Sequence, residues 1–266
     1  FTIPLQNLCL RTYPKLIYYE IRMKFEKIVI TGGSRGIGKA LVDLFLQDNC
    51  EIHVIARNFR DQPQASNLIF HSLDLTETDK ISEFIEIFIK KYGVPDLVIN
   101  NAGSGAFFEW NSFPEAEIYK QINLLFVVPV LFCRRLAPAM ANRNGGMIVN
   151  ISTLATLYPV PCMPMYNASK SALSSFTQSM ILEYNNPKFL DVILGDVRTE
   201  FNEVAAKGKT DSYSPKTKKA WKQVEEQLKC SPEADQIAQD IKSKIDRGKS
   251  SKVYGGGFLH KTIYPW

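Results

Sequence analysis

The sequence predicts a single α/β domain built on a doubly wound parallel sheet. Three observations carry this prediction. Short apolar runs alternate with segments of helical period from residue 27 onward, which is the pattern of right-handed βαβ units. Several of these runs are apolar throughout, as expected of strands that are covered on both faces. The chain has 266 residues and is 45% hydrophobic, which is enough for one substantial core.

The first half of the domain is expected to contain four strands. KIVIT leads directly into a glycine-rich turn, and a helix follows with Ile37, Leu41 and Phe45 on one face. EIHVIA and NLIFHSLDL are the next two strands. Thr76 and Asp79 form a capping-box-like start to the second helix, with Asp in the place of the usual Glu. PDLVIN is the fourth strand.

The second half continues the alternation. A long helix is expected at about residues 115–140, followed by the strand GMIVNIS, and a helix at about 165–184 precedes the strand LDVILG. Residues 200–230 are polar, rich in lysine and without strong periodicity. The last helix is predicted to begin at Ser231 with Pro232 in its first position, and the strand SKVYG closes the series.

The first 22 residues stand apart from this pattern. They are apolar and aromatic, but prolines and basic residues break them into runs too short to span a bilayer. They also lack the apolar core and small-residue cleavage site of a signal peptide. We interpret residues 1–22 as an extension to one domain at residues 23–266. A peripheral membrane anchor or an oligomer contact is the alternative.

Composition narrows the partners and the compartment. The net charge of +5 is mild, and the basic residues are scattered except near residues 207–222, so nucleic acid is not an expected partner. The cysteines contain no C-x-x-C pair, which predicts neither a metal site nor a disulfide framework and indicates an intracellular, cytoplasmic protein. The five cysteines are Cys9, Cys50, Cys133, Cys162 and Cys230.

The stretch TGGSRGIGKA, residues 31–40, contains two phosphate-binding patterns. Read from Gly33 it is G-x-x-x-x-G-K followed by Ala40, where a nucleotide triphosphatase needs a hydroxyl to bind magnesium. Read from Gly32 it is G-x-x-x-G-x-G, a dinucleotide-binding turn. Alanine cannot bind the metal, and only Asp74 offers an acid at a later strand end. The sequence therefore favours a dinucleotide, and magnesium-dependent ATP turnover would indicate the alternative.

Each glycine of the dinucleotide pattern has a physical use. Gly32 turns the chain, and Gly36 lets the backbone approach a pyrophosphate. Gly38 lets the helix and the strand pack closely. Glycines also occur in plain turns, so the other polar motifs of the chain decide the interpretation.

The segment YNASK places Tyr166 and Lys170 at i and i+4, on one face of a helix. A phenol has a reference pKa near 10, so a neighbouring cation is needed to make it a useful acid or base at neutral pH. Ser152 ends a strand, where its hydroxyl can bond a substrate oxygen or serve as a helix cap. Asn123, inside an apolar helical stretch, is either a satisfied core polar group or part of a proton path.

In chain order, T-G-x-x-x-G-x-G, NNAG, Asn123, Ser152 and Y-x-x-x-K resemble the motifs of the short-chain dehydrogenase/reductase family. The resemblance covers roughly residues 24–257 and implies a Rossmann fold. It also implies that Tyr166 exchanges a proton with the substrate oxygen and that Ser152 polarises that oxygen. Lys170 would lower the tyrosine pKa and bond the nicotinamide ribose, and Asn123 would hold a water that links Lys170 to solvent.

The same resemblance implies a set of cofactor contacts, with Asp74 at the adenine and Val197 and Thr199 at the nicotinamide amide. The implied cofactor-binding residues are Gly32, Ser34, Arg35, Gly36, Ile37, Gly38, Arg57, Asp74, Leu75, Asn100, Ala102, Gly103, Tyr166, Lys170, Val197 and Thr199. The chain departs from the family pattern in two places. Leu194 stands where the family usually has proline, and the span between Ser152 and Tyr166 is about one residue longer than common, which affects the shape of the substrate pocket.

The second strand ends in HVIARN and offers no acid for the ribose hydroxyls of NAD. Arg57 near that end and Arg35 in the glycine turn favour the 2′-phosphate of NADP(H), although each could also be a solvated surface charge. We therefore expect the reduction of a lipophilic carbonyl, such as a fatty-acyl, steroid or retinoid-like ketone, by a homodimer or homotetramer. Phe107, Phe108 and Trp110, with Leu154, Leu157 and Met163, would line an apolar pocket.

Two other classes of function stay open at this point. A non-catalytic NADP(H)-binding regulator could keep the fold, but it would have little reason to keep Ser152, Tyr166 and Lys170 together. A membrane-docked assembly protein could use the aromatic ends of the chain for peripheral contact. Residues 200–230 are expected to gate the substrate site, because the segment is too polar to bury much surface.

Overall fold

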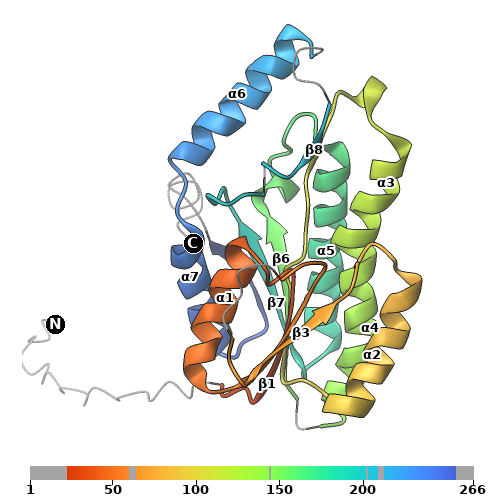
Figure 1. Cartoon of the computed structure of the whole chain (residues 1–266), viewed down its shortest axis with the longest axis vertical. Helices are drawn as coiled ribbons and strands as arrows, with labels where there is room; N and C mark the ends of the chain where they lie inside the picture. The colour runs from red at the N-terminus through yellow and green to blue at the C-terminus, as the bar shows by residue number, and fades with distance from the viewer. Residues whose placement is uncertain (1–22, 60–63, 144, 202, 209–212, 256–266) are drawn as a thin grey trace, which may run out of the picture.

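The computed structural model (Figure 1) describes residues 23–59, 64–143, 145–201, 203–208 and 213–255. The predicted N-terminal extension and residues 256–266 lie outside them. The described residues form one domain around a seven-stranded sheet in the order β3-β2-β1-β4-β6-β7-β9, with every pairing parallel. The strands are β1 Lys27–Thr31, β2 Glu51–Ala56, β3 Leu68–Ser72, β4 Leu97–Asn100, β6 Met147–Thr153, β7 Lys188–Leu194 and β9 Ser251–Gly255.

Helices cover both faces of the sheet, as the alternation of the sequence predicts. The doubly wound parallel fold is therefore confirmed. The helices are α1 Gly36–Phe45, α2 Asp79–Tyr92, α3 Glu115–Ile122, α4 Val128–Ala141, α5 Pro164–Glu183, α6 Pro215–Lys229 and α7 Ala234–Asp246. Figure 1 shows α1 and α7 on one side of the sheet and α2, α3, α4 and α5 on the other.

One half of the core lies between the sheet and the pair formed by the first and last helices. The α1 face predicted from the sequence packs in this cluster together with residues of the strands and of α7. The α7 residues of this cluster are Ile237, Ala238, Ile241 and Ile245. The second half of the core packs α2 and α4 against the opposite face of the sheet.

The long apolar stretch predicted before β6 contains an irregularity. The structure has α3, then a π-helical turn at Asn123–Val127, then α4. The combined stretch Glu115–Ala141 has 27 residues, and an 18-residue window within it has a mean hydropathy of 1.7, so among the described residues it is one helix that could span a membrane by length and composition. Here it packs against the sheet as a core helix, and core helices commonly meet the same criteria.

The structure corrects the prediction for residues 200–230. Half of this segment is a regular helix, α6, whose N-terminus is capped by the Ser214 hydroxyl accepting a bond from the Thr217 N–H at 3.3 Å. Thr217, Trp221, Val224 and Leu228 recur at spacings of three and four and make the less exposed side of the helix. The lysines elsewhere on the helix make the segment so polar overall that this helical period is hard to recognise in the sequence.

Two predicted helix starts also move. Helix α2 begins at Asp79 with Thr78 as its N-cap residue, whereas the Thr76 N–H and hydroxyl donate to Asp74 at 2.9 and 2.8 Å. Helix α7 begins only at Ala234. The Arg198 N–H donates to the carbonyl of Pro232 at 2.9 Å, and this pairing holds the chain extended just before the helix.

Candidate active site

A large cleft of about 1940 Å³ lies beyond the carboxyl ends of the strands. It begins at the ends of β3 and β2, passes the glycine turn after β1 and the ends of β4 and β6, and continues under α6. The strand order reverses between β1 and β4, and ligands of doubly wound sheets bind at such a point. The predicted motifs at the strand ends therefore meet in one place.

The glycine turn has the geometry that its sequence predicts. Gly32 and Gly36 have φ angles of 67° and 54°, in the region that favours glycine. A Cβ on Gly38 would lie 2.3 Å from the carbonyl oxygen of Gly32 and 2.5 Å from Nδ2 of Asn101, so helix and turn are in close contact there. Gly38 thus packs behind the turn and does not line the cleft, which corrects its predicted place among the direct cofactor contacts.

The N-terminus of α1 opens toward the cleft. Arg35, its N-cap residue, has extended backbone and makes no side-chain cap, and no acidic residue stands in the first turn. The first N–H groups of a helix carry partial positive charge and need an acceptor. A Cβ on Gly36 would lie 3.5 Å from Thr199 on the opposite wall. The turn and the helix N-terminus fit the pyrophosphate of a dinucleotide, and Val197 and Thr199 line the cleft opposite them.

Hydrogen bonds fasten the loop after β4 to the glycine turn. The hydroxyl of Thr31 accepts from the N–H groups of Asn101 and Ala102, both at 3.0 Å. The Asn101 amide donates to the carbonyls of Thr31 and Gly32, both at 3.1 Å. Asn101, Ala102 and Gly103 line the cleft at this point. The two loops therefore form one rigid floor under the cofactor site.

The structure corrects the predicted place of Asn100 among the cofactor-binding residues. Its side chain is buried on the α4 face of the sheet, where its amide donates to Asn150 at 2.7 Å, and it does not line the cleft. Successive side chains of a strand point to opposite faces. Asn101 therefore takes the place in the cleft that the sequence assigned to Asn100.

The far end of the cleft carries opposite charges. Arg57, after β2, lies 3.8 Å from the carboxylate of Asp74, after β3, and Leu75 lines the same region. Burial acts to raise the pKa of Asp74, but the hydrogen bonds from Thr76 and the charge of Arg57 outweigh it and lower that pKa. Arg57 is 62% exposed, so it stays available to an anion. Ser34, Arg35 and Ile37 line the cleft between this end and the turn.

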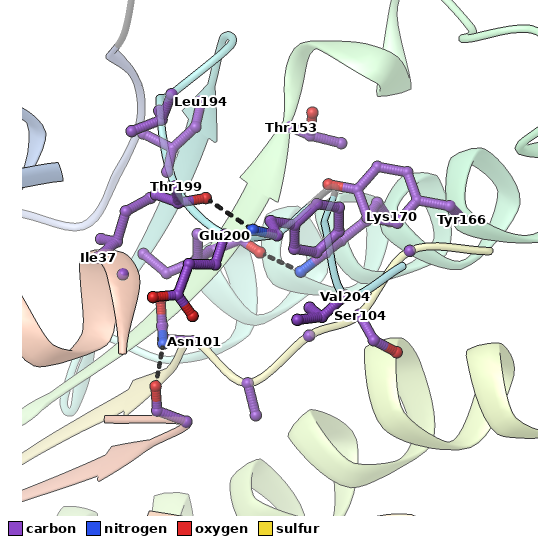
Figure 2. Close-up of a pocket in the computed structure, with 18 of the residues that line it drawn as sticks. Ile37, Asn101, Ser104, Thr153, Tyr166, Lys170, Leu194, Thr199, Glu200 and Val204 are labelled. Atoms are coloured by element: carbon purple, nitrogen blue, oxygen red, sulfur yellow. Dashed lines mark hydrogen bonds between the residues drawn. The ribbon is translucent and has the colours of Figure 1, made fainter. Parts of the chain in front are cut away.

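The opposite end of the cleft brings together the residues predicted for chemistry. Ser152, at the end of β6, is buried, and Tyr166 and Lys170 extend from α5 toward the same place. Figure 2 shows Tyr166, Lys170 and Thr153 at this end, with Ile37, Asn101 and Thr199 across the cleft. Lys170 Nζ donates to the carbonyl of Ile151 at 2.6 Å, which fixes the ammonium beside β6.

Burial controls the protonation of both reactive side chains. It lowers the pKa of Lys170 to about 8, against the opposing charge of Asp191. It raises the pKa of Tyr166 to about 12, a rise that the Thr153 hydroxyl reduces and the charge of Asp196 increases. Loss of hydration of the phenolate is the largest effect on the Tyr166 pKa, and the expectation that Lys170 lowers this pKa stays a prediction. Tyr166 is thus a protonated phenol at neutral pH.

Asn123 lies outside the cleft lining. It begins the π-helical turn between α3 and α4 and is half-buried. A π-helical turn is rare and is frequently found near functional sites. Asn123 is therefore not a direct part of the cleft wall. Its predicted role in a proton path would require a water molecule that connects it to Lys170.

The predicted aromatic lining is divided between core and surface. Phe107 is fully buried in a cluster with Met163 and Tyr213, whereas Trp110 is 64% exposed. Leu154 and Met163 line the cleft as predicted. The sequence did not indicate Phe201, whose ring lies 5.6 Å from the Tyr166 ring and above Gly105. No local pattern marks Phe201, because its place depends on the fold of the segment after Thr199.

Residues 200–230 are attached to the domain at several points. A short strand, β8 Ala206–Lys207, pairs with β5 Ala106–Phe107. The Tyr213 hydroxyl donates to the Phe107 carbonyl at 3.0 Å. The carboxylate of Glu109 accepts from the Ser214 N–H at 2.9 Å and from the Thr217 hydroxyl at 2.6 Å. One side of α6, including Ala220, Val224 and Leu228, then lines the cleft.

Fold and cleft define a dinucleotide-binding α/β protein with a phenol and an ammonium at the reactive end. A model of the family described as short chain dehydrogenase matches residues 26–210, which are more than half of the chain. The chain therefore belongs to the short-chain dehydrogenase family, whose members are NAD(P)-dependent oxidoreductases that act on CH–OH or carbonyl groups.

Curated relatives agree with this membership. An uncharacterized oxidoreductase of Schizosaccharomyces pombe is 31% identical over 169 residues, which are 61% of this chain and 56% of that protein. A 3-ketodihydrosphingosine reductase of Bacteroides thetaiotaomicron is 28% identical over 184 residues, 68% of this chain and 67% of that protein. The chain thus spans between half and two thirds of the length of these relatives.

Solved structures share the fold. A 4-hydroxyisoleucine dehydrogenase complexed with NADH has a TM-score of 0.74 at 23% identity, and the match covers 86% of this chain and 96% of that one. An L-sorbose reductase from Gluconobacter frateurii, complexed with NADPH and L-sorbose, has a TM-score of 0.71 at 20% identity and covers 91% and 99%. The same fold therefore accommodates either nicotinamide cofactor.

Proposed function

We propose that the protein is an NADP(H)-dependent oxidoreductase that interconverts a carbonyl and a secondary alcohol, and that it reduces a lipophilic ketone. One observation supports this above the others. Ser152, Tyr166 and Lys170 gather at one end of a cleft whose other end is a glycine turn at an open helix N-terminus. A non-catalytic regulator would not need this reactive end.

Each residue at the reactive end has a defined task. The nicotinamide supplies or accepts a hydride when it is bound. The Tyr166 hydroxyl donates its proton to the substrate oxygen during reduction, and the buried Ser152 hydroxyl, which has no hydrogen-bond partner among the described residues, is available to the same oxygen. Lys170 holds positive charge beside Tyr166 and is placed to bond the nicotinamide ribose. Asn123 would hold a water behind Lys170.

The wall of the cleft beyond Tyr166 favours an apolar substrate. It is formed by the proline-containing turn before α5 and by a side of α6 that carries Ala220, Val224 and Leu228 together with polar residues. The apolar residues at this wall include Leu154, Val160, Met163, Val204, Val224 and Leu228. Burial of such surfaces contributes roughly 25 cal/mol per Å². The named activity of the Bacteroides relative, a reductase of a long-chain ketone, has the same chemical character.

The cofactor preference provides a test. We expect NADPH to bind at least tenfold more tightly than NADH, because Arg35 and Arg57 line the cleft and a charge-assisted bond to a 2′-phosphate contributes about 1.5–3 kcal/mol. Fluorescence titration of both cofactors gives the ratio. Replacing both arginines with alanine should remove most of the difference, whereas Arg135→Ala on the far surface, where Arg135 pairs with Glu86, should not. Equal affinities in the unaltered protein would exclude the preference.

Gating by residues 200–230 is a second expectation. The segment follows Thr199 on the cleft wall and carries Phe201 and α6 over the reactive end. Closure over a ternary complex would exclude water from hydride transfer. Amide hydrogen exchange should slow at residues 215–229 when NADPH and a ketone are added together, with α7 as an internal reference. Unchanged exchange in α6 would mean that this segment is a fixed wall.

The substrate itself is identified by a panel. Fatty-acyl, steroid and retinoid-like ketones and the corresponding alcohols are offered with NADPH or NADP, and the nicotinamide absorbance is followed. Short hydrophilic ketones serve as the comparison and should react poorly. A homo-oligomer, a cytoplasmic location and peripheral membrane contact through the termini remain predictions that light scattering and liposome flotation can check.

A further inference from the structure

Two charged side chains lie in the interior of the protein. Among the described Asp, Glu, Lys and Arg residues, only Lys170 on α5 and Asp191 on β7 are buried, with 5% and 0% exposure. Both lie in the layer between α5 and the sheet. A charge removed from water is costly unless an opposite charge compensates it. Their common location makes each available as the partner of the other.

The reactive helix itself positions Asp191. Tyr166, Lys170, Ser174 and Gln178 follow one another at i, i+4 spacing and therefore lie along one face of α5. The Ser174 hydroxyl donates to Asp191 Oδ2 at 2.6 Å, and the Gln178 amide donates to the same oxygen at 3.1 Å. Ser174 and Gln178, the C-terminal pair on this face of α5, thus bind the Asp191 carboxylate. Tyr166 and Lys170, the N-terminal pair, are the reactive side chains.

The surroundings of Asp191 offset part of the cost of burying its charge. Burial is the largest effect and leaves the pKa of Asp191 raised, while the hydroxyls of Ser174 and Ser152, the charge of Lys252 and the Gln178 amide reduce that rise. Lys252 is its partner in the β7–β9 register, on the neighbouring strand. The other oxygen, Oδ1, has no hydrogen bond of normal length and angle within the described part of the chain, and neither has the Ser152 hydroxyl, so the effect of Ser152 on Asp191 is that of a loosely placed donor. The negative charge on Oδ1 of Asp191 is therefore balanced mainly by the electrostatic attraction of nearby positive charges and not by a well-formed hydrogen bond.

The buried positive charge of Lys170 also lacks a directly paired opposite charge. Its Nζ makes a hydrogen bond to the neutral carbonyl of Ile151, and burial disfavours its charged form. Within the described residues, Asp191 is the charged group that raises the pKa of Lys170. The two groups do not form a direct salt bridge, so Lys170 stays free to face the cleft.

We propose that Asp191 is the counter-charge of Lys170, a positioning residue that keeps this ammonium protonated where it serves the nicotinamide ribose and the proton of Tyr166. The proposal rests on the role given to Lys170 under the proposed function. Its test does not need turnover or cofactor, so the two can fail separately.

The direct test is a titration of Lys170 in the protein labelled with ¹³C at the lysine Cε, with the resonance assigned by Lys170→Met. In the unaltered protein the pKa should lie at about 8. Asp191→Asn should lower it by about one pH unit, as expected for the loss of a nearby charge in a poorly polarisable interior. Asp196→Asn is the matched control, since Asp196 acts on Tyr166 and should leave Lys170 unchanged. An unshifted Lys170 in Asp191→Asn overturns the proposal.

A stability cycle gives an independent readout. Asp191→Asn should lower the Tm of the unaltered protein, because it leaves Lys170 without compensation. In the Lys170→Met background the same substitution should raise the Tm, because it removes the remaining buried charge. A purely structural role of Asp191 would change the Tm equally in both backgrounds and would overturn the proposal. The cycle also remains informative if Asp191→Asn alone folds poorly, because the double variant carries no buried charge.

Discussion

Tyr166→Phe is expected to lower kcat for ketone reduction by roughly 10²–10⁴-fold, the usual contribution of a positioned general acid. The aromatic ring, its packing against Phe201 and the shape of the cleft stay as they are, so cofactor affinity should change little. Stopped-flow or steady-state kinetics with NADPH and a ketone from the substrate panel give kcat, and fluorescence titration gives the affinity. Only the proton donor is removed.

The control for this variant is Tyr184→Phe, at the C-terminal end of the same helix and far from the cleft lining. It should leave kcat unchanged. The pH profile adds a second check. Because the pKa of Tyr166 is raised to about 12 and that of Lys170 is lowered to about 8, reduction should decline above about pH 8 as Lys170 loses its proton, well before Tyr166 ionises. A Tyr166→Phe protein with near-normal kcat would show that another group is the acid.

Gly38→Ala should disrupt the cofactor site. The new methyl group would lie 2.3 Å from the carbonyl oxygen of Gly32 and 2.5 Å from Nδ2 of Asn101. Neither atom can yield easily, since one is backbone and the other holds two hydrogen bonds to the turn. Overpacking of this kind costs about 1–3 kcal/mol, and the displaced turn should weaken NADPH binding by roughly 10–100-fold.

Gly33→Ala is the comparison for overpacking alone. Gly33 lies in the same turn without a positive φ and does not line the cleft, and its Cβ would lie 2.7 Å from a methyl group of buried Val54 and 3.1 Å from one of Val42, so this variant should lose stability without the backbone clash of Gly38→Ala. Urea unfolding and NADPH titration of both variants separate loss of fold from loss of binding. Comparable affinity of Gly38→Ala and the unaltered protein would contradict the role of Gly38 in shaping the site.

Local patterns predicted most of the scaffold. The strands and α1 follow from runs of apolar residues and from the 3.6-residue period, which depend only on neighbours in the chain. The spacing that places Tyr166 and Lys170 on one face of α5 is local in the same sense. Helix α6 is not predicted from the sequence, because its many lysines make the whole segment polar and hide the small difference in hydrophobicity between its less exposed side and the rest of the helix.

Other parts of the site depend on contacts that the sequence does not reveal. Asn100 and Asn101 are adjacent and identical in type, and only the register of β4 in the sheet decides which one faces the cleft. Asp191 lies inside an apolar strand, and its partners on α5 are 13 and 17 positions away in the sequence. Such residues become visible only when helix and strand are placed together.

The pairing of the first and last helices has a consequence for synthesis of the chain on the ribosome. The phosphate-binding helix α1 emerges early, but the residues that cover Leu41 and Phe45 include Ile241 and Ile245 of α7, more than 190 residues later. At a translation rate of about 5–20 residues per second, this apolar face waits on the order of ten seconds or more for its cover. A nascent chain stalled before α7 would present that face to chaperones, and the packing behind the cofactor site would be completed only after α7 has emerged.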